Sequence, residues 1–377
     1  MDAITFHGPV AGPTGYDAVV RYLGQELEFR GVQVCVTAKA DWCPVTAELP
    51  LQKVEMIRRW VHRPSMGEIV VHVCLPTQVQ LNPGKINVCF TMYESQTFPK
   101  AWDSVLRVID YIVVPTEHCR RGFLEHGFSE ERVFVVPLGS VSLPKGYEFK
   151  PTTFSVERNG RLCANVPVPR KRFLAIGEWV ARRQYMRLIE AYLTAFKSGW
   201  DDVGLYLRTN SYGSDQLAGL WSKVAKARAL LRSTAPIYLI SSRLSEEDLL
   251  ALYTWATHYV SFSAGEGWDL SCAQAAACGL ELIVPQHTAY REYLSDKEAH
   301  FVPAARQATI QADLGLDSIY GRDALWTIPD FGVFVDRLQT ADRLVRKGPA
   351  AAEHMANSYS WSSSAERFLE VMELING

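Results

Sequence analysis

Two adjacent arginines, Arg182 and Arg183, follow a run of apolar residues that predicts a buried strand over 173–176. A helix is expected to begin just after them, and cations are unfavourable at a helix N-terminus unless an anion lies nearby. A guanidinium pair at a strand-to-helix junction suits an anion, because guanidinium groups bind phosphate and carboxylate oxygens through paired N–H donors. The pair is therefore expected to hold an anionic ligand, and the alternative is a solvated pair of surface charges.

A second stretch, residues 261–285, has the composition of a phosphate-binding turn. A strand is expected to end at Phe262, followed by a loop with two glycines, a helix of small residues and another buried strand over 282–284. Asp269 and Ser271 are residue types that begin helices. The free N–H groups at the start of such a helix would face a phosphate docked in the loop. The glycine spacing matches neither the dinucleotide nor the P-loop pattern.

Glu266 and Gln274 flank this turn with seven residues between them. The chain reads Gly265-Glu-Gly-Trp-Asp-Leu-Ser271 and then Gln274-Ala-Ala-Ala-Cys-Gly279. This layout resembles the Glu–seven residues–Glu signature of the family 4 retaining glycosyltransferases. The resemblance covers nearly the whole chain and is strongest over 177–294. An ordinary loop-to-helix turn is the alternative, and it accounts for the small residues but not for the placed Glu and Trp.

The resemblance implies a function. The fold would be GT-B, with two doubly wound Rossmann-like domains facing each other across a cleft. The reaction would be the retaining, metal-independent transfer of a hexose from a UDP- or GDP-linked sugar to an acceptor hydroxyl. The nucleotide sugar would be a co-substrate, and no cofactor is expected. The acceptor is left open among a glycan, a lipid, a protein and a modified nucleobase.

The resemblance also assigns roles to residues. Arg182 and Arg183 would grip the diphosphate, Glu266 would bond a hydroxyl of the transferred sugar, and backbone N–H groups over 268–270 would meet a phosphate. The expected donor site comprises Gly15, Gly177, Arg182, Arg183, Arg243, Leu244, Glu266, Gly267, Trp268, Asp269, Leu270 and Gln274. The expected catalytic residues are Glu266, Arg182, Arg183 and Glu94.

Three of these expectations have open alternatives. Glu94, at the end of a predicted strand over 85–91, would contact the acceptor or the transferred sugar, or would be a solvated loop carboxylate. The glycines before and at Gly15 would let the backbone approach a ligand, or would only form the turn. Arg243 and Leu244, in a segment that begins at residue 241, would line the nucleobase pocket by analogy of fold.

Two residues depart from the family pattern. Gln274 stands where the family carries a second Glu that accepts from the ribose hydroxyls, and its amide keeps one acceptor while adding donors. Asp269 stands where Gly is usual, so its carboxylate could repel a phosphate or could cap the helix while pointing away. These departures motivate a second hypothesis, a GT-B protein that binds a nucleotide, a sugar or a partner without transfer.

The order of predicted elements indicates two α/β domains. A length of 377 residues exceeds that of one ordinary core. Residues 1–150 are expected to form an N-terminal acceptor-side domain, residues 151–171 a connector and residues 172–359 a C-terminal domain that binds the nucleotide sugar. A helix within residues 360–377 is expected to return to the first domain. Expected strands lie at 3–6, 32–37, 68–74, 85–91, 111–115 and 132–137, then at 173–176, 203–208, 237–240, 258–262 and 282–284. Expected helices lie at 16–29, 102–108, 119–126, 187–197, 214–231 and 331–345, and Ser360 is expected to cap a final helix that ends near Leu374.

Composition narrows the class of protein. The net charge of −2, with 48% hydrophobic and 21% charged residues, implies no electrostatic attraction to nucleic acid or anionic membrane. No Asp-x-Asp metal clamp occurs, so no metal site is expected. The chain contains no apolar run of about eighteen residues and no signal-peptide pattern at its start. The eight cysteines contain no Cys-x-x-Cys pair, which favours reduced thiols and a cytoplasmic protein.

Overall fold

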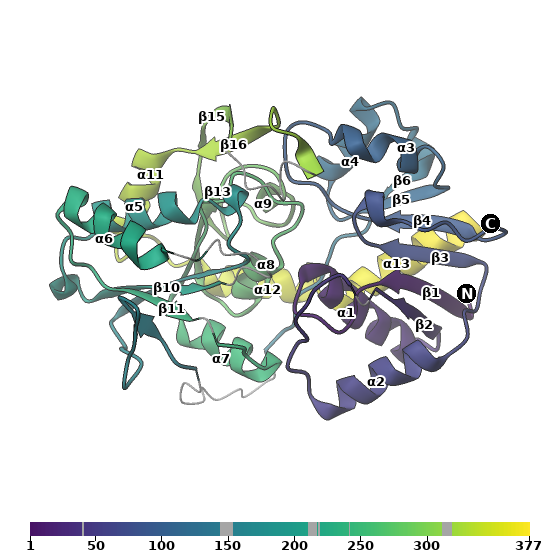
Figure 1. Ribbon diagram of the computed structural model, residues 1–377, viewed down its shortest axis with the longest axis horizontal. Helices are drawn as coiled ribbons and strands as arrows, with labels where there is room; N and C mark the ends of the chain where they lie inside the picture. The colour runs from purple at the N-terminus through teal and green to yellow at the C-terminus, as the bar shows by residue number, and fades with distance from the viewer. Residues whose placement is uncertain (40, 144–153, 210–216, 218, 241, 311–318) are drawn as a thin grey trace.

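The computed structural model describes residues 1–39, 41–143, 154–209, 217, 219–240, 242–310 and 319–377. Two lobes, each built around its own sheet, face each other (Figure 1). Both chain ends lie in the lobe formed by the N-terminal residues (Figure 1). The expectation of two doubly wound α/β units is confirmed by the sheets, which are parallel in their central strands.

The N-terminal sheet has six parallel strands in the order β2-β1-β3-β4-β5-β6. They are β1 (Ala3–Gly8), β2 (Gln33–Ala38), β3 (Ile69–Val73), β4 (Ile86–Phe90), β5 (Tyr111–Val114) and β6 (Val133–Val135). Its helices are α1 (Gly15–Phe29), α2 (Leu51–His62), α3 (Asp103–Leu106) and α4 (Glu117–Glu125). Thr14 and Asp17 form a capping box that begins α1, and Gly31, at φ +83°, follows its end.

Two elements of this lobe differ from expectation. Helix α2 was not predicted, although Met56 and Trp60 are buried one turn apart on it. A Cβ on Gly24 of α1 would lie 2.9 Å from the Trp60 ring, so the glycine allows the two helices to approach closely. The helix expected over 102–108 is only a 3₁₀ turn followed by the four-residue α3, because the chain must turn to enter β5.

The C-terminal sheet has eight strands in the order β14-β13-β12-β9-β10-β11-β7-β8. The parallel strands are β9 (Lys171–Ile176), β10 (Val203–Arg208), β11 (Ile237–Ile240), β12 (His258–Val260), β13 (Glu281–Pro285) and β14 (His300–Val302). The short hairpin β7 (Glu157–Arg158) and β8 (Arg161–Leu162) adds antiparallel strands at the edge, inside the expected connector. The first part of that connector, and the start of a helix expected over 214–231, fall outside the described residues.

Helices cover this sheet. They are α5 (Tyr185–Ala195), α6 (Leu220–Leu231), α7 (Glu246–Trp255), α8 (Leu270–Ala277) and α9 (Tyr290–Tyr293), with α11 (Phe331–Gln339) and α12 (Gly348–Ser358) after the last strand. A helix was expected over 331–345, but α11 stops at Gln339. There the Thr340 hydroxyl bonds the Asp336 carbonyl in a local contact that competes with further helix. None of the described helices is long and apolar enough to cross a lipid bilayer.

The final helix returns to the first lobe. Helix α13 (Trp361–Asn376) begins at Ser360, whose hydroxyl accepts from the Ser363 N–H, and runs beneath the N-terminal sheet (Figure 1). The Trp361 ring stacks on Tyr22 of α1 with centroids 5.2 Å apart, and Phe368 lies 6.0 Å from Phe6 of β1. This crossing ties the two lobes together at one end of the cleft.

A hairpin joins the lobes at another point. Strands β15 (Ala304–Thr309) and β16 (Leu325–Pro329) are antiparallel and were not predicted. Trp326 on β16 packs with the aromatic cluster of the N-terminal lobe, which includes Trp102. The main chain of Leu325 accepts from the Gln96 N–H at 2.8 Å, so this hairpin holds the two lobes in contact beside the cleft.

Candidate functional site

The strand order of the C-terminal sheet reverses between β9 and β12. From β9 the chain proceeds outward through β10 and β11, and then continues on the other side through β12 and β13. Ligand crevices of open α/β sheets form at the carboxyl ends of the strands at such a switch point. The segments that follow β9 and β12, residues 177–184 and 261–269, therefore lie side by side at this edge of the sheet.

A short turn after β9 places the two arginines at this edge of the sheet. Residues 181–183 form one turn of 3₁₀ helix, and Gln184, at φ +51°, precedes α5. The Ala264 N–H donates to the Arg182 carbonyl at 2.8 Å, which ties this turn to the loop after β12. Gly177, at φ +154°, passes beside Arg183, since a Cβ at Gly177 would lie 3.1 Å from the guanidinium carbon.

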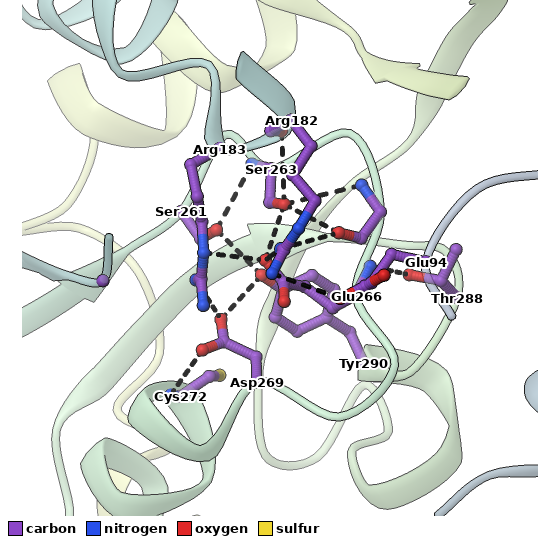
Figure 2. Close-up of polar contacts among 12 residues, drawn as sticks. Glu94, Arg182, Arg183, Ser261, Ser263, Glu266, Asp269, Cys272, Thr288 and Tyr290 are labelled. Carbon is purple, nitrogen blue, oxygen red and sulfur yellow. Dashed lines mark hydrogen bonds and ion pairs between the residues drawn. The ribbon is translucent and has the colours of Figure 1, made fainter. Parts of the chain in front are cut away.

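Glu266 lies at the centre of the resulting cluster (Figure 2). Its Oε1 atom lies 2.6 Å from Nη1 of Arg182 and 3.0 Å from Nε of Arg183, and it accepts from the Ser263 hydroxyl at 2.7 Å. Glu94, at the end of β4 in the other lobe, pairs with Arg182 at 3.3 Å between Oε1 and Nη2. The structure thus brings all four expected catalytic residues together.

Asp269 completes the cluster. It is the N-cap of α8 at φ +61°, and its Oδ1 accepts from the Cys272 N–H at 3.4 Å. Its Oδ2 lies 3.1 Å from Nη1 of Arg183 and accepts from the Tyr290 hydroxyl at 2.8 Å. Of the two roles considered for this residue, capping is observed, but the carboxylate points toward the arginine cluster rather than away from it.

Burial and charge shift the ionisation of these groups. Burial raises the pKa of Glu94 to about 7; Arg182 opposes this shift and Glu266 adds to it. Burial disfavours the charged form of Arg182, but Glu266 and Glu94 more than compensate and raise its pKa. Arg183 has its pKa raised in the same way by Asp269 and Glu266. Both guanidiniums therefore stay charged, whereas Glu94 titrates near neutral pH.

Several residues of the cluster were not predicted. Tyr290 also bonds Ser261 at 2.8 Å between the hydroxyl oxygens, and Tyr259 donates to Asp269 at 3.3 Å. The Glu266 N–H donates to the Thr288 hydroxyl at 3.1 Å. Thr288 and Tyr290 follow the carboxyl end of β13, the strand next to β12. Their position after a buried strand was the sequence signal available for them.

Glycines of the loop after β12 contact the other lobe closely. A Cβ on Gly265 would overlap the carbonyl oxygen of Glu94, and a Cβ on Gly267 would lie 2.7 Å from Cβ of Met92. Gly15, the first residue of α1, lies near Leu270, with 3.6 Å between a Cβ placed there and the Leu270 side chain. These residues line the meeting surface of the two lobes.

The remaining predicted residues lie elsewhere. Gln274 bonds the backbone of Val141 twice, accepting from its N–H at 3.0 Å and donating to its carbonyl at 2.8 Å. Trp268 is buried and packs on Tyr293, with ring centroids 4.7 Å apart. Arg243 and Leu244 lie between β11 and α7, and among the described residues no bond joins them to the arginine cluster. Residue 241, where the expected nucleobase segment begins, lies outside the described residues.

No model of a protein family matches the chain, and no curated protein matches it by sequence. Solved structures do share its fold. Sucrose-phosphate synthase from Thermosynechococcus elongatus matches with a TM-score of 0.65 at 15% identity, over 100% of this chain and 99% of that one. HepE of Anabaena, in complex with UDP and glucose, matches with a TM-score of 0.61 at 9% identity, over 99% of this chain and 100% of that one.

The protein has the GT-B fold. A further match is TarM of S. aureus, in a complex that contains UDP, with a TM-score of 0.55 at 14% identity. That match covers 80% of this chain and 55% of TarM, so this chain spans little more than half the length of that relative. Identities this low show the shared GT-B fold alone, and what the site does must be argued from its own residues.

Proposed function

We propose that this protein is a retaining, metal-independent glycosyltransferase that moves a hexose from a UDP- or GDP-linked sugar to an acceptor hydroxyl. One observation carries the proposal. Glu266 lies more than eighty residues after Arg182 and Arg183 in the chain, yet it contacts both of them in one cluster at the switch point of the C-terminal sheet. HepE and TarM, which share the fold, have been solved with UDP bound.

Each residue of the cluster has a role in this reaction. The two guanidiniums stabilise the charge that develops on the departing diphosphate. As the bond between the anomeric carbon and the diphosphate breaks, an oxygen of the departing diphosphate takes the proton of the acceptor hydroxyl. The acceptor oxygen bonds to the anomeric carbon from that same face, so the configuration at this carbon is retained. Glu266 bonds a sugar hydroxyl. Glu94 comes from the N-terminal lobe, and a carboxyl group that titrates near neutral pH can accept or donate a hydrogen bond to the acceptor.

A panel of UDP- and GDP-linked hexoses tests the proposal. We expect hydrolysis or transfer with one donor class, and proton NMR of the product should show the anomeric configuration of the donor. Replacing Arg182 and Arg183 together by Ala should lower kcat/KM by more than about a hundredfold, since removing such transition-state contacts costs several kcal/mol. Arg187→Ala is the matched control, because this half-exposed arginine on α5 pairs with Glu190 at 2.7 Å and lies over the Phe331 ring, away from the arginine cluster.

The proposal is wrong if no donor is turned over and neither nucleotide binds. It is also wrong if Arg187→Ala lowers turnover as much as the double variant does. An inverted product would refute retention while leaving glycosyl transfer standing.

A non-catalytic GT-B protein is the second candidate, and two observations favour it. The side-chain oxygen and nitrogen of Gln274 both form hydrogen bonds with the Val141 backbone rather than with a ribose. Asp269 takes up part of the Arg183 guanidinium. Turnover of the native chain and of Gln274→Glu separates the candidates: if only the variant turns over, the native protein is a binding protein.

A further inference from the structure

The arginine cluster contains more acid than base. Three carboxylates, from Glu94, Glu266 and Asp269, surround two guanidiniums. Glu266 and Asp269 are buried, and the side chains of Glu94, Arg182 and Arg183 are only 13–16% exposed. A nucleoside diphosphate would add further negative charge to a site that already has an excess of it. Like charges at these separations repel strongly where water is excluded, so ligand binding requires that some negative charge be removed.

Two of the carboxylates are held firmly in place. Glu266 contacts both arginines and Ser263. Asp269 is fully buried and bonds Arg183, Tyr290 and the backbone of α8. Neither side chain can move away without losing several of these contacts.

Glu94 is different. Among the described residues Glu94 makes one ion pair, the 3.3 Å contact with Arg182, and it lies on the opposite lobe from the other four groups. The charged groups that face it are Arg182, Arg183 and Glu266. Its neighbours Tyr16 and Cys119 are neutral, because burial raises the pKa of each well above neutral pH. Burial raises the pKa of Glu94 itself to about 7. A further negative charge beside it favours the protonated form of this carboxyl group.

We propose that binding of the donor's diphosphate is coupled to the uptake of one proton by Glu94. This inference rests on the proposed function, and it adds a chemical step to donor binding. The proton comes from solvent and attaches to a carboxylate oxygen of Glu94. The ion pair between Glu94 and Arg182 is thereby broken, and the freed Nη2 of Arg182 binds a phosphate oxygen. When the nucleotide leaves, the proton returns to solvent and the ion pair forms again.

Calorimetry with UDP and GDP, the leaving groups alone, measures this proton directly. Titrations at pH 8 in Tris and in HEPES, whose ionisation enthalpies differ, give the number of protons taken up per nucleotide bound. We expect the native chain to take up most of one proton per nucleotide, because Glu94 makes its ion pair with Arg182 as a carboxylate before the nucleotide binds. Above pH 8 the affinity should fall about tenfold for each further pH step of one, by proton linkage.

Variants locate the proton. Glu94→Gln keeps the shape of the side chain and should reduce the uptake to near zero and flatten the pH dependence of affinity. The terminal phosphate of the nucleotide, with a second pKa of about 6, is also ionised at pH 8. Any proton uptake by this phosphate would persist in the Glu94→Gln variant. Glu178→Gln is the matched control, since Glu178 also interacts with both arginines and burial raises its pKa. It should keep the native uptake.

The outcomes separate the two proposals. Binding without proton uptake contradicts this inference and leaves the glycosyltransferase proposal standing. Uptake that survives Glu94→Gln, or that is abolished by Glu178→Gln instead, also contradicts it, because the proton would then lie elsewhere. Failure of both nucleotides to bind contradicts the proposed function, and this inference with it.

Discussion

Arg183 compensates two buried carboxylates, so its removal should reveal how strongly the cluster contributes to stability. Its guanidinium lies 3.0 Å from Glu266 and 3.1 Å from Asp269, and its side chain is 13% exposed. Met fills a comparable volume without charge. Breaking a buried ion pair by removing one partner costs about 3–5 kcal/mol, because the other charge stays buried and uncompensated. We therefore expect Arg183→Met to destabilise the protein by about this amount.

Adding Asp269→Asn to the first variant should restore part of the loss. Asn tolerates a positive φ and caps helices, so α8 is preserved while the uncompensated charge disappears. The remaining cluster of Arg182, Glu266 and Glu94 lacks one anion, and we expect recovery of about 2 kcal/mol, a coupling typical of residues in direct contact. Arg187→Ala, which removes a half-exposed pair on α5, should change stability by less than about 1 kcal/mol.

Urea denaturation followed by far-UV circular dichroism measures these differences, with the midpoint and slope fitted separately for each variant. In thermal unfolding of the same variants, the Tm should fall by about 2–4 °C for each kcal/mol of stability lost in a domain of this size. A loss below about 1 kcal/mol for Arg183→Met would show that the guanidinium is solvated rather than buried among carboxylates. A double variant no more stable than the single one would show that Asp269 does not depend on Arg183.

Two further predictions concern the closure of the lobes and the acid stability of the C-terminal sheet. Gly267→Ala places a Cβ 2.7 Å from Cβ of Met92, so the two lobes should move apart. X-ray scattering should then give a larger radius of gyration than that of the native protein, and turnover should fall. An unchanged radius of gyration and an unchanged turnover would contradict the close contact. Burial alone would raise the pKa of Glu281, but hydrogen bonds from His300 and from the backbone N–H groups of residues 347–348 outweigh this effect and lower the pKa to about 2. Because this folded-state pKa lies below the unfolded value of 4.5, the stabilisation is complete above pH 4.5 and is lost as the pH falls toward 2. Urea midpoints measured between pH 6 and pH 2 should thus fall less steeply for Glu281→Gln, and identical slopes would count against the bonded carboxylate.

The meeting of the two arginines with Glu266 was predictable in outline. Both segments follow buried strands, and a doubly wound sheet brings the carboxyl ends of adjacent strands to one edge. The strand pattern was equally accessible, since the buried parallel strands are short apolar runs bounded by glycine, proline or charge. The first and last helices were predicted from their residue patterns, and Ser360 marked where α13 begins.

Other parts of the structure had weak local signals. Half of the residues of helix α2 are apolar, but only Met56 and Trp60 are buried, and their burial depends on contacts with β2 and with Gly24 of α1. Strand β15 is exposed along most of its length, so it has no hydrophobic alternation to mark it. Its pairing with β16, and the packing of Trp326 on the other lobe, are long-range contacts that no local pattern announces.

The sequence by itself determined the α/β class and the residues that could hold an anion, because strand burial and helix capping are written in neighbouring side chains. Only the tertiary structure decided what those residues hold in this protein. Asp269 turns toward Arg183 because its left-handed backbone and two tyrosines from β12 and α9 aim the carboxylate there. Glu94 joins them from the other lobe across the cleft. Charge balance among buried groups depends on distance in space, and that distance is set by how the two sheets pack against each other.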